Sequence, residues 1–158
     1  MSIVLARVDD RLIHGQVATS WIRSNAIEVA VVVDDKIGND DQQKSILKMS
    51  APASTKVYAM GVDKFLDKYN KGILDKYRVM LVFENVFAPL ELIKKGLMIK
   101  TLNLGGIRFK EGRTTYTKSV SLTDEEKKCI LDLNSLGVHV FSQQVLADEP
   151  IDIISLIK

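Results

Sequence analysis

Short apolar runs rich in Val, Ile and Leu alternate with amphipathic stretches along the whole chain. The apolar runs predict strands at residues 3–8, 28–33, 56–60, 78–83, 101–104 and 138–141. Some of these runs have no polar interruption, as is typical of strands that are covered on both faces. Between the runs, apolar residues recur at helical spacing and predict helices at residues 15–24, 39–49, 62–69, 89–95 and 124–136.

This alternation predicts an α/β fold: a single domain over residues 1–158 with an open, mainly parallel β-sheet and helices on both faces. The helix over 124–136 has clear end signals, because Thr123 and Glu126 match a capping box and Gly137 follows as a stop. The polar tract 108–118 predicts a short hairpin or excursion before that helix. Residues 151–157, after Pro150, predict a last short helix.

Composition narrows the function classes. The chain carries 22 Lys and Arg against 20 Asp and Glu, and this near-neutral mixture argues against nucleic-acid binding, which needs a concentrated basic face. One cysteine, Cys129, allows no internal disulfide and fits a reducing compartment; its helical spacing places it in the core. No apolar stretch approaches the ~18 residues of a membrane span, and no signal peptide is evident. We expect a soluble, cytoplasmic protein.

Metal and nucleotide chemistry find no support in the sequence. His14, His139 and Cys129 lack the spacing of metal ligands, and the glycine-rich phosphate and dinucleotide motifs are missing. Asp34 and Asp35 end the second predicted strand, where a solvated turn is favoured over a magnesium site. We therefore expect no metal and no cofactor.

The turn after the first predicted strand holds the densest group of chemically active residues: Asp9, Asp10, Arg11, His14, Gly15 and Gln16. Open α/β sheets bind their ligands at such turns. An imidazole can accept a phosphoryl group on a ring nitrogen, and Arg11 can donate charge-assisted hydrogen bonds to phosphate oxygens. A histidine near a helix start is more often a surface or capping residue. The polar neighbours, and a glycine that lets the backbone approach an anion, favour the phosphate site.

Further candidates are expected at the same edge of the sheet. Gly105 and Gly106 end a predicted strand, and we favour a close backbone approach to the His14 loop over a simple tight turn. His139, inside an apolar run, is expected to be a core or sheet-end residue. Four cations, Arg108, Lys110, Arg113 and Lys118, form a basic tract that is either a solvated loop or, if it lies near His14, a docking surface for an acidic partner.

Three segments carry a resemblance to a known family: Ile-Val-Leu-Ala-Arg-Val-Asp-Asp-Arg-Leu-Ile-His-Gly-Gln-Val at residues 3–17, Asn-Leu-Gly-Gly at 103–106, and Thr-Lys-Ser-Val-Ser-Leu-Thr at 117–123. The sequence resembles the IIB component of the mannose/fructose/sorbose family of the bacterial phosphoenolpyruvate-dependent sugar phosphotransferase system. The resemblance covers essentially the whole chain. It implies an open, mainly parallel sheet with helices on both faces, in agreement with the pattern above.

The resemblance also implies a phosphocarrier, a protein-Npi-phosphohistidine–sugar phosphotransferase. His14 would accept the phosphoryl group on Nδ1 from a phosphohistidine of a IIA protein. It would then pass the group to a sugar held by the membrane subunits IIC and IID, with which the protein would associate peripherally. The choice of sugar (mannose, fructose, sorbose or an amino sugar) is expected to reside in those subunits, and the protein itself to be a monomer or weak homo-oligomer.

The resemblance also implies a role for each polar residue of the turn that contains His14. Arg11 would neutralise charge that develops on the transferring group. Asp9 or Asp10 would hold the second imidazole nitrogen and set the tautomer. Backbone N–H groups of Gly15 and Gln16, at a helix start, would receive phosphate oxygens.

Two other function classes fit the same residues. One is a non-catalytic module that binds a phosphorylated small molecule at this edge. The other is a regulatory protein in which phosphorylation of His14 serves only as a signal.

Overall fold

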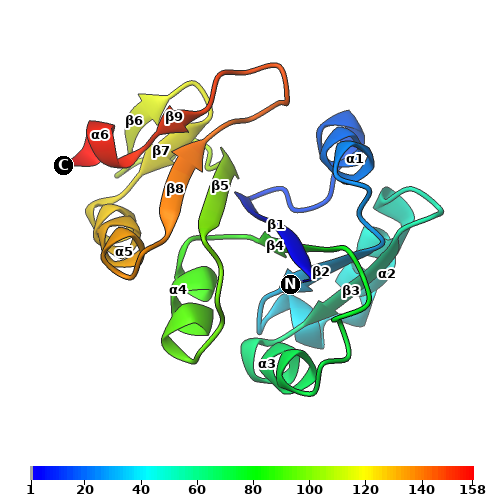
Figure 1. The fold of residues 1–158 in the computed structure, drawn as a ribbon. Helices are drawn as coiled ribbons and strands as arrows, with labels where there is room; N and C mark the ends of the chain where they lie inside the picture. The colour runs from blue at the N-terminus through cyan, green and yellow to red at the C-terminus, as the bar shows by residue number, and fades with distance from the viewer. Residues whose placement is uncertain (1) are drawn as a thin grey trace.

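The protein is built around one sheet of seven strands. The computed structural model describes residues 2–158, without the side chains of Gln16 and Val17. The strand order is β3-β2-β4-β1-β5-β8-β9, and each pairing is parallel except that of β8 with β9 (Figure 1). The strands of this sheet are β1 (Ile3–Asp9), β2 (Val29–Val33), β3 (Lys56–Met60), β4 (Val79–Phe83), β5 (Thr101–Gly106), β8 (His139–Ser142) and β9 (Ile151–Asp152). A separate antiparallel hairpin consists of β6 (Thr114–Thr117) and β7 (Val120–Leu122).

Helices cover both faces of the sheet. They are α1 (Gly15–Ser24), α2 (Asp41–Ser50), α3 (Val62–Asn70), α4 (Phe87–Lys94), α5 (Asp124–Ser135) and α6 (Ile154–Ile157), with a short 3₁₀ helix, η1 (Ile37–Asn39). The helices α1 and α2 lie on one face, and α3, α4 and α5 lie on the other (Figure 1). The predicted α/β fold, with its open and mainly parallel sheet, is therefore confirmed.

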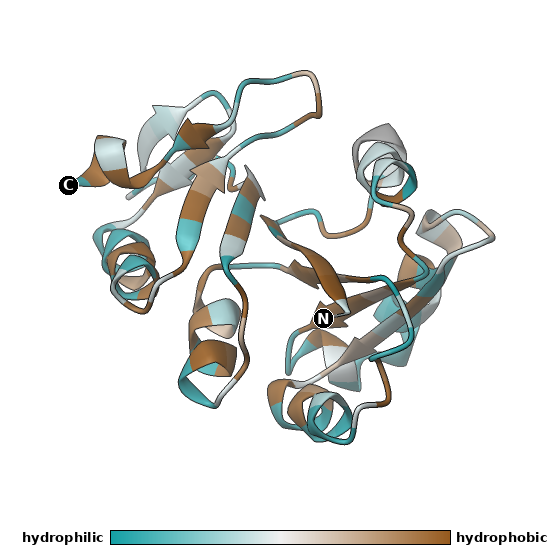
Figure 2. Cartoon of the chain, in the orientation of Figure 1, coloured by the Kyte–Doolittle hydropathy of each residue, from teal (hydrophilic) through white to brown (hydrophobic). Residues whose placement is uncertain are grey.

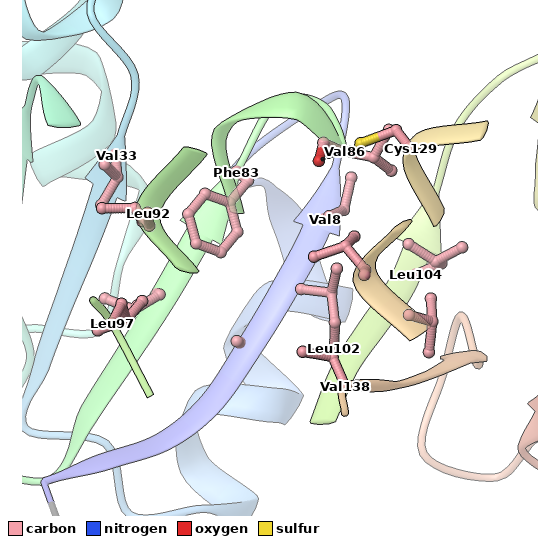
Figure 3. Packing of buried hydrophobic residues seen from close by; sticks show 14 of the residues in the cluster. Val8, Val33, Phe83, Val86, Leu92, Leu97, Leu102, Leu104, Cys129 and Val138 are labelled. Carbon is pink, nitrogen blue, oxygen red and sulfur yellow. Dashed lines mark hydrogen bonds between the residues drawn. The ribbon is translucent and has the colours of Figure 1, made fainter. Parts of the chain in front are cut away.

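Two cores follow from the alternation of side chains along each strand. On β2, Val31 belongs to the core cluster on the face covered by α3, α4 and α5, whereas Ala30 and Val32 belong to the cluster on the face covered by α1 and α2. Hydrophobic colour predominates in the central strands β1, β2 and β4, while the helices carry both hydrophobic and polar colour (Figure 2). In the larger core, Val8 and Phe83 from adjacent strands lie close together (Figure 3).

The predicted boundaries agree closely with the structure where local signals are strong. The capping box of Thr123 and Glu126 is present, with both reciprocal hydrogen bonds, and α5 ends before Gly137, whose φ is +88°. A hairpin does precede α5. Cys129 is buried, and its Sγ lies 3.2 Å from the carbonyl oxygen of Val86 (Figure 3).

Two elements differ from the prediction. Residues 151–157 were expected to form one helix, but Ile151–Asp152 pairs with the edge of β8 before a shorter α6 begins. The Asp152 carboxylate accepts the backbone N–H of Ile154, which starts the helix there. The helix α4 begins two residues before Pro89, because Asn85 accepts the N–H of Phe87.

Candidate functional site

The loop between β1 and α1 lies at the carboxyl edge of the sheet, where chain connections diverge. The chain leaves β1 toward β2 on one side and leaves the neighbouring strand β5 toward β8 on the other. Open α/β sheets bind ligands at such a switch point. The predicted turn therefore occupies the expected position in the fold.

Two apolar residues anchor this loop. Leu12 and Ile13 are both buried, in the core under α1. The N–H of Leu12 donates to the carbonyl oxygen of Asp9, and Leu12 takes a φ of +61°, which is uncommon for a branched side chain. The anchoring holds the loop in this conformation and keeps Arg11 and His14 beside the surface.

His14 is half-buried and is the N-cap residue of α1, with extended backbone angles and no side-chain capping bond. Within the described residues, neither ring nitrogen has a hydrogen-bond partner, and both are shielded from solvent. The expectation that Asp9 or Asp10 holds an imidazole nitrogen is thus wrong for this conformation. Among the described residues, no hydrogen bond to the imidazole fixes its tautomer or its orientation.

Asp9 instead connects two guanidinium groups. Its Oδ1 accepts the backbone N–H of Arg11 at 3.0 Å and lies 3.6 Å from Nε of the same residue. Its Oδ2 accepts from Arg7 at 3.3 Å. Asp9 thus contacts Arg11 at its backbone and at Nε. The Arg11 side chain is still 35% exposed, so the guanidinium remains accessible.

Arg7 is a site residue that the sequence reasoning missed. It is buried, and its guanidinium donates to Asn103 Oδ1 at 2.6 Å and to the carbonyl oxygens of Gln143 and Gln144 at 3.2 and 3.0 Å. It also lies 4.9 Å from the ring centroid of Trp21. Burial lowers the pKa of Arg7, and the Asp9 carboxylate opposes that shift. One signal was available: a cation in the middle of an otherwise apolar strand.

Gly106 lies close to the start of the His14 loop, as was favoured, whereas Gly105 lies against Arg7 of β1 and not against the loop. A Cβ at Gly105 would overlap the Arg7 guanidinium, and one at Gly106 would come within 3.2 Å of Asp9 Oδ1. The carbonyl oxygen of Gly106 also accepts the N–H of Asp10. Both glycines therefore give room to the polar network beneath the His14 loop.

Asp10 joins the His14 loop to the start of the basic tract. Its Oδ2 accepts the backbone N–H of Arg108 at 2.9 Å and Nε at 3.2 Å, while its Oδ1 has no partner within the described residues. The Arg108 side chain is 64% exposed. The start of the tract is thus bound to the loop that contains His14.

The four cations of the tract do not share one role. Arg113 makes a two-pronged pair with Glu126 at 3.0 Å for each bond, and both side chains are largely buried. Lys118 binds Asp148 at 2.7 Å and holds the pKa of that carboxyl below its usual range. Arg108 and Lys110 are the exposed pair near the loop.

The remaining candidates lie as follows. Gly15 begins α1 with a φ of +51°. The backbone of Gln16 lies in the first turn of this helix, and the side chain of Gln16 is outside the described part. His139 opens β8 at the opposite, amino edge of the sheet, where it is exposed and stacks on Phe141 with 5.8 Å between ring centroids. Asp34 accepts two backbone N–H groups of its own turn.

Residues 2–158 contain neither a cluster of metal ligands nor a helix that could span a membrane. No group of three or more His, Cys, Asp and Glu side chains has the arrangement of a metal site. None of the described helices has the length and apolar character needed to cross a membrane.

The chain is similar in sequence and in structure to members of a single protein family. The family model described as "PTS system sorbose subfamily IIB component" matches residues 3–158. The chain is 37% identical over 158 residues to the fructose-specific EIIB component of Bacillus subtilis, covering 100% of this chain and 97% of the relative. It is 34% identical to the mannose-specific EIIAB component of Escherichia coli, covering 100% of this chain and 49% of that longer relative. The solved IIBSor domain of the sorbose permease from Klebsiella pneumoniae superposes with a TM-score of 0.94 at 32% identity, covering 99% and 96% of the two chains.

Proposed function

The chain belongs to the sorbose subfamily of IIB components of the sugar phosphotransferase system, and from that premise we propose that His14 is its phosphoryl carrier. IIB components are phosphotransferases, so this chain is a sugar phosphotransferase component. The observation that carries the proposal is that one loop, at the switch point of the sheet, holds both an imidazole without a hydrogen-bond partner among the described residues and a partly exposed guanidinium next to the Asp9 carboxylate.

The first transfer forms a bond between phosphorus and a ring nitrogen of His14 as the nitrogen–phosphorus bond of the donor phosphohistidine breaks. The neutral imidazole attacks with a lone pair and keeps its proton on the other nitrogen. In the conformation seen, both nitrogens of His14 are turned away from solvent. Transfer in this scheme requires the ring to rotate outward, and among the described residues no hydrogen bond to either nitrogen opposes that rotation.

Arg11 supplies the charge that this transfer needs. Phosphoryl transfer depends mainly on positioning and on stabilising the equatorial oxygens. The backbone N–H and Nε of Arg11 are braced by Asp9, which leaves the terminal nitrogens to bind the phosphoryl oxygens. The start of α1, at Gly15 and Gln16, adds backbone N–H groups and the positive end of the helix dipole.

The second transfer returns the carrier to its first state. A sugar hydroxyl oxygen bonds to phosphorus, the bond to His14 breaks, and the hydroxyl proton is released. The donor in this scheme is a IIA protein and the sugar is held by membrane subunits IIC and IID. The mannose-specific relative from E. coli is an EIIAB component of which this chain covers 49%, and this supports a IIA partner.

The proposal can be tested by incubating the protein with labelled phosphoenolpyruvate, the general phosphotransferase proteins and a IIA protein. The wild type is expected to acquire one acid-labile, base-stable phosphoryl group and to lose it to sugar when membranes with IIC and IID are added. His14→Ala should take up none.

His139→Gln is the matched control, because it removes the other histidine at the opposite edge of the sheet; it should label like the wild type. A wild type that never labels would point to a small-molecule binding module. One that labels but never discharges to sugar would point to a signalling role. Either result overturns the proposal.

A further inference from the structure

Phe109 is the most exposed large apolar side chain that the described residues place at the carboxyl edge, at 66%. Met49 and Met98 are more exposed, but they lie near the ends of crossover connections that return to the amino edge. Isolated exposed apolar residues are ordinary. The surroundings of Phe109 are what distinguish it.

The segment that presents Phe109 is rigidly braced at both ends. At its start, Asp10 binds the backbone and side chain of Arg108. At its end, Arg113 donates through Nη1 to the carbonyl oxygen of Arg108 at 2.7 Å, and its N–H donates to the carbonyl oxygen of Lys110 at 3.0 Å. Because Arg113 is itself fixed by the largely buried Glu126, the turn from 108 to 113 is held from the helix α5.

Bracing of this kind has a consequence for binding. A side chain on a preformed turn loses little conformational freedom when a partner covers it, whereas a mobile loop has to be ordered first. Aromatic and arginine side chains are also those that most often dominate binding energy when they enter a partner's pocket.

Charge indicates the partner. Arg108 and Lys110 stand on either side of Phe109, with Glu111 the one acid in the turn, and Asp10 ties this turn to the loop of His14. A protein that brings a phosphoryl group to His14 carries negative charge at the point of contact. An aromatic side chain between two cations fits an apolar pocket bordered by carboxylates near that phosphoryl group.

We propose that Phe109, flanked by Arg108 and Lys110, is the anchor by which this protein docks the IIA phosphodonor. This inference rests on the proposed function, since it takes His14 as the acceptor. It assigns to an apolar side chain a docking role that the sequence pattern suggested only for the cations.

The test compares transfer from phospho-IIA to the full chain for wild type, Phe109→Ala, Phe109→Leu and Met98→Ala. Phe109→Ala should lower the second-order transfer rate about tenfold, by raising KM for phospho-IIA while kcat stays unchanged. Phe109→Leu should recover part of the loss. Met98→Ala, an equally exposed apolar change at the opposite edge, should behave as wild type.

The outcomes separate this inference from the proposed function. If the wild type is never phosphorylated, the proposed function fails and the inference fails with it. If His14 is phosphorylated at the same rate in wild type and Phe109→Ala, the anchor is wrong while the carrier stands. If Phe109→Ala instead slows discharge to sugar in the presence of membranes, the side chain faces the membrane subunits and the assignment to IIA is overturned.

Discussion

At the residue scale, Arg11 and Arg7 differ in burial, and this difference suggests a phosphate-binding role for Arg11 and a structural role for Arg7. Both guanidinium groups contact the same carboxylate, Asp9. Arg7 is enclosed and has protein partners at both terminal nitrogens, whereas the Arg11 side chain is 35% exposed and, among the described residues, contacts Asp9 only through Nε and the backbone N–H. We therefore propose that Arg11 binds the phosphoryl group and that Arg7 supports Asp9.

Replacing Arg11 should slow the chemical step. Arg11→Ala removes one electrostatic donor and should raise the barrier by about 2–4 kcal/mol, and Arg11→Lys should lose less because charge remains without the planar fork. Rapid-quench measurement of single-turnover transfer from phospho-IIA checks this. Equal rates for wild type and Arg11→Ala would remove Arg11 from the mechanism.

Cys129 should be inert in the folded protein. Burial, with a smaller contribution from Asp132, raises the pKa of its thiol from 9.0 to about 12. The reactive thiolate is therefore scarce at about pH 8, where an unfolded cysteine with an ordinary pKa reacts readily. Iodoacetamide should label the protein quickly in urea and very slowly without it. Fast labelling of the folded protein would show that the thiol is accessible.

At the scale of elements, the strands and helices with strong local patterns were predictable, but the site's support was not. The alternation along β2 and the cap at Thr123 act over a few residues, so the sequence displays them. The bond from Arg7 to Asn103 spans 96 positions and that to Gln143 spans 136. Contacts this distant depend on the completed sheet order and have no local signature.

The pairing of Arg113 is the second example. In the sequence it is one of four similar cations, and the structure alone reveals that its partner is the N3 residue of α5. The same limit applies to β9, which forms only because β8 offers an unpaired edge.

A methyl group at Gly105 should destabilise the β1–β5 junction. Gly105→Ala places a Cβ on the Arg7 guanidinium, and an overpacked site of this kind loses about 1–3 kcal/mol of unfolding free energy. Gly106→Ala, whose Cβ would meet Asp9 Oδ1 at 3.2 Å, is the milder control. Urea unfolding measures both; an unchanged midpoint for Gly105→Ala would contradict the packing described.

Breaking the link between the basic tract and α5 should also lower stability. Arg113→Ala leaves the Glu126 carboxylate largely buried without its partner, and the expected loss is about 3 kcal/mol. The double variant Arg113→Met with Glu126→Gln should recover part of it, because no charge remains unpaired. If Arg113→Ala unfolds at the same urea concentration as the wild type, the pair contributes nothing to stability.

For the whole molecule, a net charge of +2 predicts no strong steering, so any salt dependence of docking has to come from local charge. Lys110→Glu should slow association with phospho-IIA about three- to tenfold at low salt, with the difference shrinking near physiological salt. Arg113 is unsuited to this test because its reversal would disrupt the pair with Glu126.

Lys100→Glu is the control for that experiment, because it makes the same change of net charge in the segment that leads into β5 at the amino edge. Stopped-flow association should leave it close to wild type. Equal slowing by both reversals would mean that overall charge, not the surface beside His14, governs the encounter.

The position of the phosphoryl group is the central claim, and mapping it is the most direct measurement. After transfer from phospho-IIA with labelled phosphate, trypsin releases His14 in the peptide 12–23 and His139 in the peptide 129–158. We predict that the base-stable, acid-labile label is found in peptide 12–23 alone. Label in peptide 129–158, or an acid-stable label on any other peptide, would contradict the account.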